Sequence, residues 1–381
     1  MICLSTLFID GLFIIAGLLG IGLLIAIHEF GHFIFCKLFK ISTPSFSIGM
    51  GPVIFKKKIG ETVFSLSALP IGGYVEIAGN EEVGQGDQSQ AKRNDQHSFA
   101  NKPYYQKLLV MIGGILFNTI FAYFALTLVF MAGMPKTPIL FPDETPAIVG
   151  LVKSGSAADK AGLKIGDLIY QINETVIKST TALNKIIQAS PAQPTRLHVT
   201  RDGQNMELLA IPNTITVENK QIGQLGIGFR EPKEFELLPA QSTITSIQSS
   251  FKATNELIYK TYLSIKSLFE QKSVDNMGGP ISVIFATFQG AKKGLKYFLI
   301  LLSLISINLA VLNIIPIPIM DGGQILFVTI EAIIRRPIPE KVRLAIHYTC
   351  WVLILALIAY LSFGDLKRIF WDKILTLINS K

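Results

Sequence analysis

The chain has 381 residues, of which 50% are hydrophobic and only 16% charged, and its mean hydropathy is +0.45. These values exclude an ordinary soluble protein, which carries more charge, and indicate a multispanning membrane protein with one modest soluble part. The net charge of +8 comes from Lys and Arg residues spread along predicted loops, so we expect no nucleic-acid partner. Cys3, Cys36 and Cys350 lie far apart and predict neither a disulfide framework nor a cysteine-based zinc site.

Four apolar segments are long enough to cross a bilayer core of roughly 30 Å, which takes about 20 helical residues. We predict spanning helices within residues 1–36, 104–133, 297–320 and 345–363. The first segment contains Asp10, lacks a basic start and is too long for a signal peptide, so we expect it to be retained as an anchor.

The first segment carries two histidines and a glutamate inside a run that is otherwise apolar from Leu12 to Cys36. Their spacing is H-E-x-x-H. Positions i and i+4 share one face of a helix, so His28 and His32 can bind the same metal ion. Glu29 then lies beside the metal, where it can take a proton from a bound water. A lone histidine would merely hydrogen-bond a neighbouring helix, but this spacing predicts a hydrolytic Zn²⁺ site.

Residues 37–103 form a polar loop whose first half alternates like paired β-strands. The alternating runs are Pro52–Lys58, Thr62–Leu66 and Gly72–Ile77, with a turn at residues 59–61. They predict a membrane-associated β-hairpin or small sheet. The second half, Gly79–Asn101, is rich in Gln, Asn, Asp, Gly and Ser, and we predict a mobile surface loop there.

The second spanning segment contains Gly113, Gly114 and the amide of Asn118. Small residues permit close helix contact, so these positions predict either helix packing or a place near the active site. Sequence reasoning leaves both open.

Residues 135–230 form the one predicted soluble domain, of α+β type. Alternating patterns at Ile148–Val152 and Arg196–Thr200 predict strands on either side of a short helix near Thr181–Ala189. Residues 241–275 then predict an amphipathic helix. That helix either lies at the membrane interface or packs on the soluble domain.

A catalytic zinc site usually has three protein ligands, and the end of the third spanning segment offers a candidate for the third. Pro316 and Pro318 break the helix, and Asp321 follows directly, with two glycines behind it that let the chain turn. A carboxylate at membrane depth is costly unless it is paired or bound to a cation, which makes Asp321 the favoured ligand. The alternative is that it only caps the next helix.

Other third ligands found in soluble metalloproteases are a downstream glutamate or a third histidine. The three-histidine extension H-E-x-x-H-x-x-G-x-x-H does not continue after His32. His97, His198 and His347 have no matching context, so we predict surface or structural roles for them.

Together these motifs resemble the site-2 protease family of intramembrane zinc metalloproteases, and within it the bacterial regulator-of-sigma-E protease (RseP-like) group. The matching stretches are His28–His32, Asn313–Gly323, Gly72–Val75 and Met277–Ile281, in the order typical of the family. The resemblance implies Zn²⁺ held by His28, His32 and Asp321, with Glu29 as the catalytic general base. It also implies substrates that are single-pass membrane proteins, such as anti-sigma factors, or remnant signal peptides.

The sequence departs from the family pattern at three points. Met320 stands where Leu is usual before the metal-binding aspartate, and Gly114-Ile115 replaces a Gly-Pro pair, while Asn118 remains. The best-known enterobacterial type resembles a longer chain with two outer domains, whereas this sequence has room for one.

The soluble domain resembles a PDZ domain over Gly155–Asn173. Such domains capture an extended chain end as an added strand, so peptide tails are possible partners. The alternative is a domain that only blocks access to the site.

Substrate binding is predicted at two places. A helical substrate must unwind before attack, and an edge strand made of Gly72, Gly73, Tyr74 and Val75 could hold the unwound segment by strand addition. Asn313 could bind the substrate backbone beside the metal. Two rival functions are a membrane metal-ion transporter and an inactive PDZ-bearing scaffold.

Lys and Arg residues in short loops predict the orientation in the bilayer. Basic residues gather in loop 37–103 and between the third and fourth spans, which places both on the cytoplasmic side of a bacterial inner membrane. The active site then lies toward the cytoplasm and the PDZ-like domain outside it.

Overall fold

The computed structural model describes residues 4–80, 94–217, 220–230, 236–271 and 278–378. They form two compact units: a membrane unit, Met1–Val129 with Thr243–Lys381, and an inserted unit, Phe130–Ser242. Residues 81–93 of the predicted mobile loop, and Met277 of the fourth matching stretch, lie outside the described residues.

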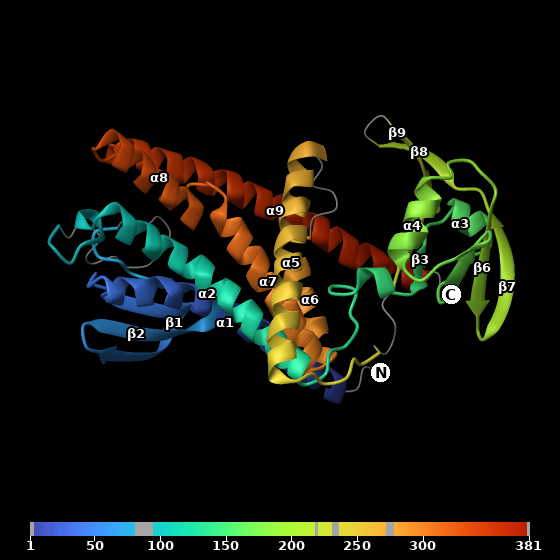
Figure 1. The fold of residues 1–381 in the computed structure, drawn as a ribbon, viewed down its shortest axis with the longest axis horizontal. Helices are drawn as coiled ribbons and strands as arrows, with labels where there is room; N and C mark the ends of the chain where they lie inside the picture. Colours follow the sequence, from blue (N-terminus) through green and yellow to red (C-terminus); the bar gives the residue numbers. More distant parts are fainter. Residues whose placement is uncertain (1–3, 81–93, 218–219, 231–235, 272–277, 379–381) are drawn as a thin grey trace. The chain divides into compact units, whose positions relative to one another are not determined.

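Among the described residues, four helices are long and apolar enough to cross a membrane, as predicted. These helices are α1 (Leu4–Leu38), α2 (Tyr104–Met131), α7 (Leu295–Ile314) and α9 (Glu340–Ile378). Within α9, residues 340–367 form the candidate span. The membrane unit also contains α5 (Thr243–Gln271), α6 (Pro280–Lys292) and α8 (Asp321–Ile334). Figure 1 shows α1, α2 and α7 running close to one another.

The predicted boundaries of the last two spans need correction. Helix α7 ends at Ile314 rather than at Met320, because Pro316 and Pro318 cannot donate backbone hydrogen bonds to a continuing helix. A separate helix, α8, begins at Asp321, so a further helix does follow the prolines, as the capping alternative for Asp321 required. Helix α9 is longer than the predicted 345–363 at both ends.

The loop after α1 folds as strands β1 (Ser45–Ile59) and β2 (Thr62–Val75), joined by a turn at Gly60 with φ of 61°. Residues Ser45–Ile48 pair with both ends of β2, namely Val63–Leu66 and Gly73–Val75. Phe46 and Val75 are buried in one apolar cluster, against which Phe33 of α1 packs. This packing holds the last residues of β2 against α1.

Helix α5 packs on α2 through small hydroxyl side chains. Ser246, Ser250 and Thr254 are buried, and Ser250 Oγ lies 2.7 Å from Thr127 Oγ1 of α2. Small and hydroxyl residues are typical of helix contacts in membranes. Ile244 and Ile247 remain exposed, whereas Phe251 stacks on Tyr123 of α2 and Leu257 is buried. Most of the buried side chains described in α5 are therefore hydroxyl side chains.

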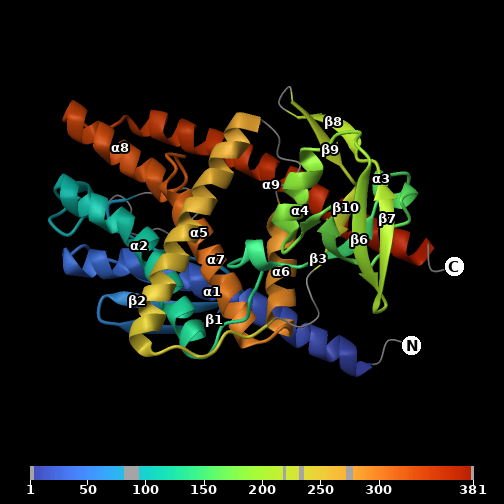
Figure 2. The ribbon, with the colours of Figure 1, turned by 45° about the vertical axis from the view of Figure 1, so that its right-hand side comes forward.

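The inserted unit is built on a sheet of strand order β10-β3-β4-β6-β7, with β5 paired to β4. Figure 2 shows this sheet with α4 and the β8–β9 hairpin beside it. The elements are β3 (Ala147–Val152), α3 (Ala157–Lys160), β4 (Leu168–Ile172), β5 (Thr175–Val176), α4 (Thr180–Gln188), β6 (Thr195–Arg201), β7 (Gln204–Ala210), β8 (Asn213–Val217), β9 (Lys220–Gln224) and β10 (Ile227–Phe229).

A buried ion pair ties two parts of the inserted unit together. Arg201 donates from Nε and Nη2 to the two carboxylate oxygens of Asp167, each at 2.7 Å, and the Asp167 side chain is fully buried. Burial alone would raise the pKa of Asp167. The Arg201 guanidinium and the Lys164 N–H outweigh that effect and hold this pKa below its usual value.

Candidate active site

Helix α1 presents both motif histidines on one face. His28 Nε2 and His32 Nε2 lie 3.2 Å apart, one helical turn from each other, as the i, i+4 spacing requires. His32 is buried, with 6% of its surface exposed. At this separation the two Nε2 atoms can bind one metal ion.

Asp321, from the C-terminal part of the chain, lies beside the Nε2 atoms of both histidines. It is the first residue of α8, directly after the turn formed by residues 315–320. Gly322 and Gly323 pack so closely on the carbonyls of Ile314 and Ile317 that no Cβ would fit at either position. The two glycines thus allow α8 to start tightly against the end of α7 and fix where Asp321 stands.

The two histidines and the aspartate form one cluster. Asp321 Oδ2 lies 3.2 Å from His28 Nε2, and Oδ1 lies 3.5 Å from His32 Nε2. One ligand atom from each residue falls within 4.8 Å of the others. The arrangement brings the three predicted ligands together.

Helix α2 closes the back of the cluster through glycines. Gly31 of α1 and Gly113 of α2 touch backbone to backbone, with no space for a Cβ on either. A Cβ on Gly114 would lie 2.5 Å from both His28 Cε1 and His32 Nε2. The sequence left two roles open for this glycine pair, and the structure shows both. Gly113 serves helix packing, and Gly114 lies next to the cluster.

The Nδ1 atoms of both histidine rings contact polar groups of α2. His32 Nδ1 lies 2.8 Å from the carbonyl oxygen of Val110, so Nδ1 carries the proton and Nε2 keeps its lone pair toward the cluster. The side-chain amide of Asn118 lies 3.3 Å from His28 Nδ1, and Asn118 is itself fully buried. Helix α2 therefore orients both rings.

Strand β2 brings its last residues to Glu29. The Val75 N–H donates to Glu29 Oε2 at 3.2 Å. A Cβ on Gly73 would lie 3.8 Å from Glu29 Cγ, so the strand passes close to α1 at this level. On its other side this segment pairs with β1, which leaves the edge that carries the Val75 N–H facing the site.

A cavity of about 140 Å³ opens at the cluster. Its walls include Asn313 of α7 and Val75 of β2, together with His28, Glu29, His32, Ile77, Met111, Ile319, Met320 and Asp321. Of the predicted substrate-binding residues, Asn313 and Val75 line the cavity, Gly73 lies against Glu29, and Gly72 and Tyr74 do not line it.

Comparison with known proteins decides the family. The model of peptidase family M50 matches residues 16–357, most of the chain. The chain belongs to peptidase family M50.

The similar proteins carry protease names. A protein of Fusobacterium nucleatum named "Putative zinc metalloprotease FN1322" is 32% identical over 352 residues, covering 92% of this chain and 97% of the relative. A Campylobacter jejuni protein named "Putative zinc metalloprotease Cj1068" is 30% identical over 363 residues, covering 93% of each chain. Protease RseP of Yersinia pestis is 25% identical over 447 residues, covering 93% of this chain and 98% of the relative.

These findings confirm the predicted enzyme class and cofactor: this member of family M50 is a zinc metalloprotease with membrane-spanning helices. The cluster fits the ion. Two imidazoles and a carboxylate are a zinc donor set of the catalytic kind, which leaves room for a water. Among the described residues, none donates a hydrogen bond to the buried Asp321 Oδ2. A buried carboxylate oxygen without a donor is what a cation would satisfy.

The other three histidines lie elsewhere. His347 is buried and stacks on Phe327 with ring centroids 5.6 Å apart. His97 Nδ1 lies 3.0 Å from the Lys40 carbonyl oxygen, and His198 belongs to β6 of the inserted unit. None of them lines the cavity at the cluster.

Proposed function

We propose that this zinc metalloprotease cleaves peptide bonds within the transmembrane segments of other membrane proteins. The observation that carries the proposal is the depth of the cluster. His28 and His32 lie in the candidate span of α1, and Met111 of α2 and Asn313 of α7, two further candidate spans, also line the cavity. A peptide bond that reaches this cavity must come from a segment at or near membrane depth.

In this proposal His28, His32 and Asp321 hold the zinc ion. When bound, zinc lowers the pKa of its water toward neutrality and polarises the scissile carbonyl. The distances among the three side chains and the unsatisfied Asp321 Oδ2 support this ligand set. The Val110 carbonyl and the Asn118 amide hold the two rings so that Nε2 of each faces the cluster.

Glu29 is the proposed general base and then the proton donor to the leaving amine. It follows His28 directly on α1 and lines the same cavity. The Val75 N–H donates to Oε2, which helps to orient the carboxylate toward the cavity. Glu29 is thus a catalytic residue and Val75 a positioning residue.

The same strand edge is the proposed holding site for an unwound substrate. Gly73, Tyr74 and Val75 pair with β1 on one side, and Gly72 directly precedes them, so a substrate strand can add on the side that faces the cavity. Asn313 lines the same cavity, and its amide is the proposed partner of the substrate backbone.

The inserted unit is proposed to be a single PDZ-like domain. Its antiparallel sheet and two short helices suit that class, and β10, at the edge of the sheet, could accept an added strand from a peptide tail. A purely steric role stays the alternative. The alignment with Yersinia pestis Protease RseP leaves about 90 positions of the relative without a residue of this chain, the length of one small domain.

We further propose an inner-membrane protein whose active site lies toward the cytoplasm, with the inserted unit outside. Basic residues of segment 37–103, between α1 and α2, and of the segment between the third and fourth spans support this orientation. The expected substrates are single-pass membrane proteins, such as anti-sigma factors, or remnant signal peptides.

Glu29→Gln tests the proposal in liposomes that contain the full-length chain and a single-pass substrate. Zinc content should equal that of the wild type, while cleavage should fall by about 10²–10⁴-fold. Glu61→Gln is the matched control, because Glu61 is a carboxylate in the exposed β1–β2 turn. Substantial residual turnover by Glu29→Gln would remove the general-base role.

A further inference from the structure

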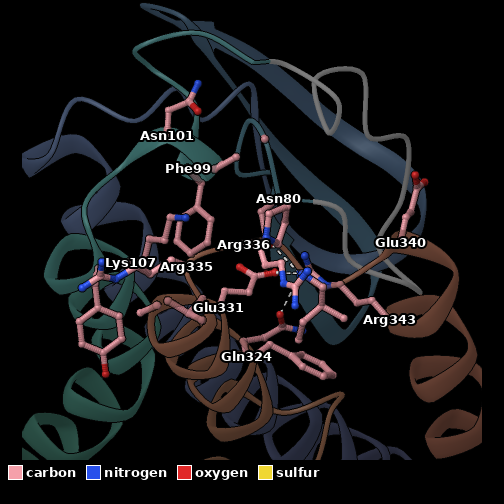
Figure 3. Close-up of a pocket in the computed structure, with 18 of the residues that line it drawn as sticks. Asn80, Phe99, Asn101, Lys107, Gln324, Glu331, Arg335, Arg336, Glu340 and Arg343 are labelled. Carbon is pink, nitrogen blue, oxygen red and sulfur yellow. Dashed lines mark hydrogen bonds between the residues drawn. The ribbon is translucent and has the colours of Figure 1, made fainter.

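A second cavity, of about 590 Å³, shares no lining residue with the cavity at the cluster. Figure 3 shows the side chains that line it. Four cationic side chains line it: Lys107 of α2, Arg335 and Arg336 of the α8–α9 connection, and Arg343 of α9. Two carboxylates, Glu331 and Glu340, also line it, so the walls carry excess positive charge.

One hydrogen-bond donor in the wall of this cavity has no acceptor among the described residues. Glu331 Oε1 accepts the backbone N–H of Ile338 at 3.1 Å. Arg343 Nη2 donates to Asn80 Oδ1 at 3.1 Å and to Gln324 Oε1 at 3.0 Å. Its Nε is buried and finds no acceptor among the residues that the structure describes. An anionic oxygen in the cavity would satisfy that N–H.

The cavity lies at the level where the membrane ends. Lys107 is in the first turn of the α2 span, and Arg343 is in the first turn of the α9 span. A side chain at the end of a spanning helix stands among lipid headgroups. Apolar side chains, including Phe99, Phe327 and Leu344, complete the walls beside the cations.

We propose that this cavity binds the phosphate group of an anionic membrane lipid. The guanidinium groups match phosphate oxygens, and the apolar walls take the glycerol and the first acyl carbons. A volume of about 590 Å³ suits a headgroup, whereas a free phosphate ion would leave most of it unfilled. The proposal is independent of the assigned substrate and of the general base.

The test uses the full-length chain in neutral detergent, mixed with phosphatidylglycerol or phosphatidylcholine, with retained lipid counted by native mass spectrometry. We expect preferential retention of phosphatidylglycerol. Lys107→Gln and Arg336→Gln should each lower its affinity by about fivefold, and the double variant by about 25-fold. Neither side chain makes a described hydrogen bond or ion pair whose loss would unfold the chain. Lys102→Gln/Lys341→Gln is the matched control, because it removes two charges at the same end without touching the cavity walls.

These measurements and two further arms, inorganic phosphate and Lys107→Arg, decide the outcome. Equal retention of both lipids, or equal phosphatidylglycerol retention by the double and control variants, overturns the proposal. If inorganic phosphate binds as tightly as the lipid and displaces it, the ligand is a soluble phosphate and the lipid proposal is overturned. The charge-preserving Lys107→Arg should retain the lipid; loss of lipid in that variant would also overturn the proposal.

Discussion

Replacing Gly114 with alanine tests the geometry of the metal cluster. The new Cβ would lie 2.5 Å from His28 Cε1 and His32 Nε2, about 1 Å inside ordinary van der Waals contact. Neither ring can move away without loss, because the Val110 carbonyl and the Asn118 amide hold the two rings at Nδ1. The rings must therefore shift relative to Asp321, and disturbed ring positions of this kind cost about 10–100-fold in metal affinity.

The assay is competition for zinc against a chelator of known affinity, with purified full-length protein in detergent. Gly11→Ala is the control, because Gly11 lies in α1, the helix that carries both histidines, and a Cβ there meets nothing within 4 Å. The thermal midpoint of each variant separates a local effect from unfolding. A Gly114→Ala protein that binds zinc within about twofold of the wild type would refute the reasoning, since the expected loss is at least tenfold.

Three other predictions follow from the same structure. Asp321→Ala should lower zinc content in the purified protein by removing one of three ligands; normal occupancy, measured by atomic emission, would remove Asp321 from the ligand set. Val75→Pro removes the N–H that reaches Glu29 and should slow substrate cleavage with zinc still bound. Val75→Ala keeps this N–H and should cleave at close to the wild-type rate once folding is matched. Equal cleavage rates for the two variants would argue against a role of the strand edge in cleavage. Asp167→Asn should destabilise the inserted unit by about 3 kcal/mol, because Arg201 loses its buried partner. In the wild type this contribution is complete above pH about 4, the usual pKa of aspartate, and is lost as pH falls through the lower folded pKa. The variant should lack that acid-dependent loss in denaturant titrations, and identical pH profiles would contradict the assignment.

The polar residues of the cluster were predictable because they stand out from apolar surroundings. A histidine, glutamate or aspartate in a membrane span is costly without a function, so its presence carries information. The structure brings His28, His32 and Asp321 together across nearly 300 positions of sequence, as the motifs indicated.

Backbone contributions to the site were not predictable from sequence. The Val110 carbonyl orients His32 and the Val75 N–H orients Glu29, and any residue at those positions supplies the same group. The adjacent glycines of α2 were the only signal of a close helix approach, and they did not say which helix approaches. Tertiary packing alone supplies that answer.

Element boundaries failed where local and global signals conflict. Hydropathy continues past Ile314 to Met320, but two prolines end the helix earlier, and α8 then begins at Asp321. The residues of α5 showed helical periodicity, yet its buried face is the hydroxyl face. In a membrane protein the apolar face can point outward, so periodicity gives the helix but not the direction of its packing.

The most direct test of intramembrane proteolysis is the position of the cut. A single-pass substrate is incubated in liposomes with wild-type or Glu29→Gln protein, and the new termini are mapped by mass spectrometry. We expect wild-type termini inside the apolar segment of the substrate and none with Glu29→Gln. New termini confined to the soluble flanks, or the same cuts with Glu29→Gln, would contradict a zinc site that works at membrane depth.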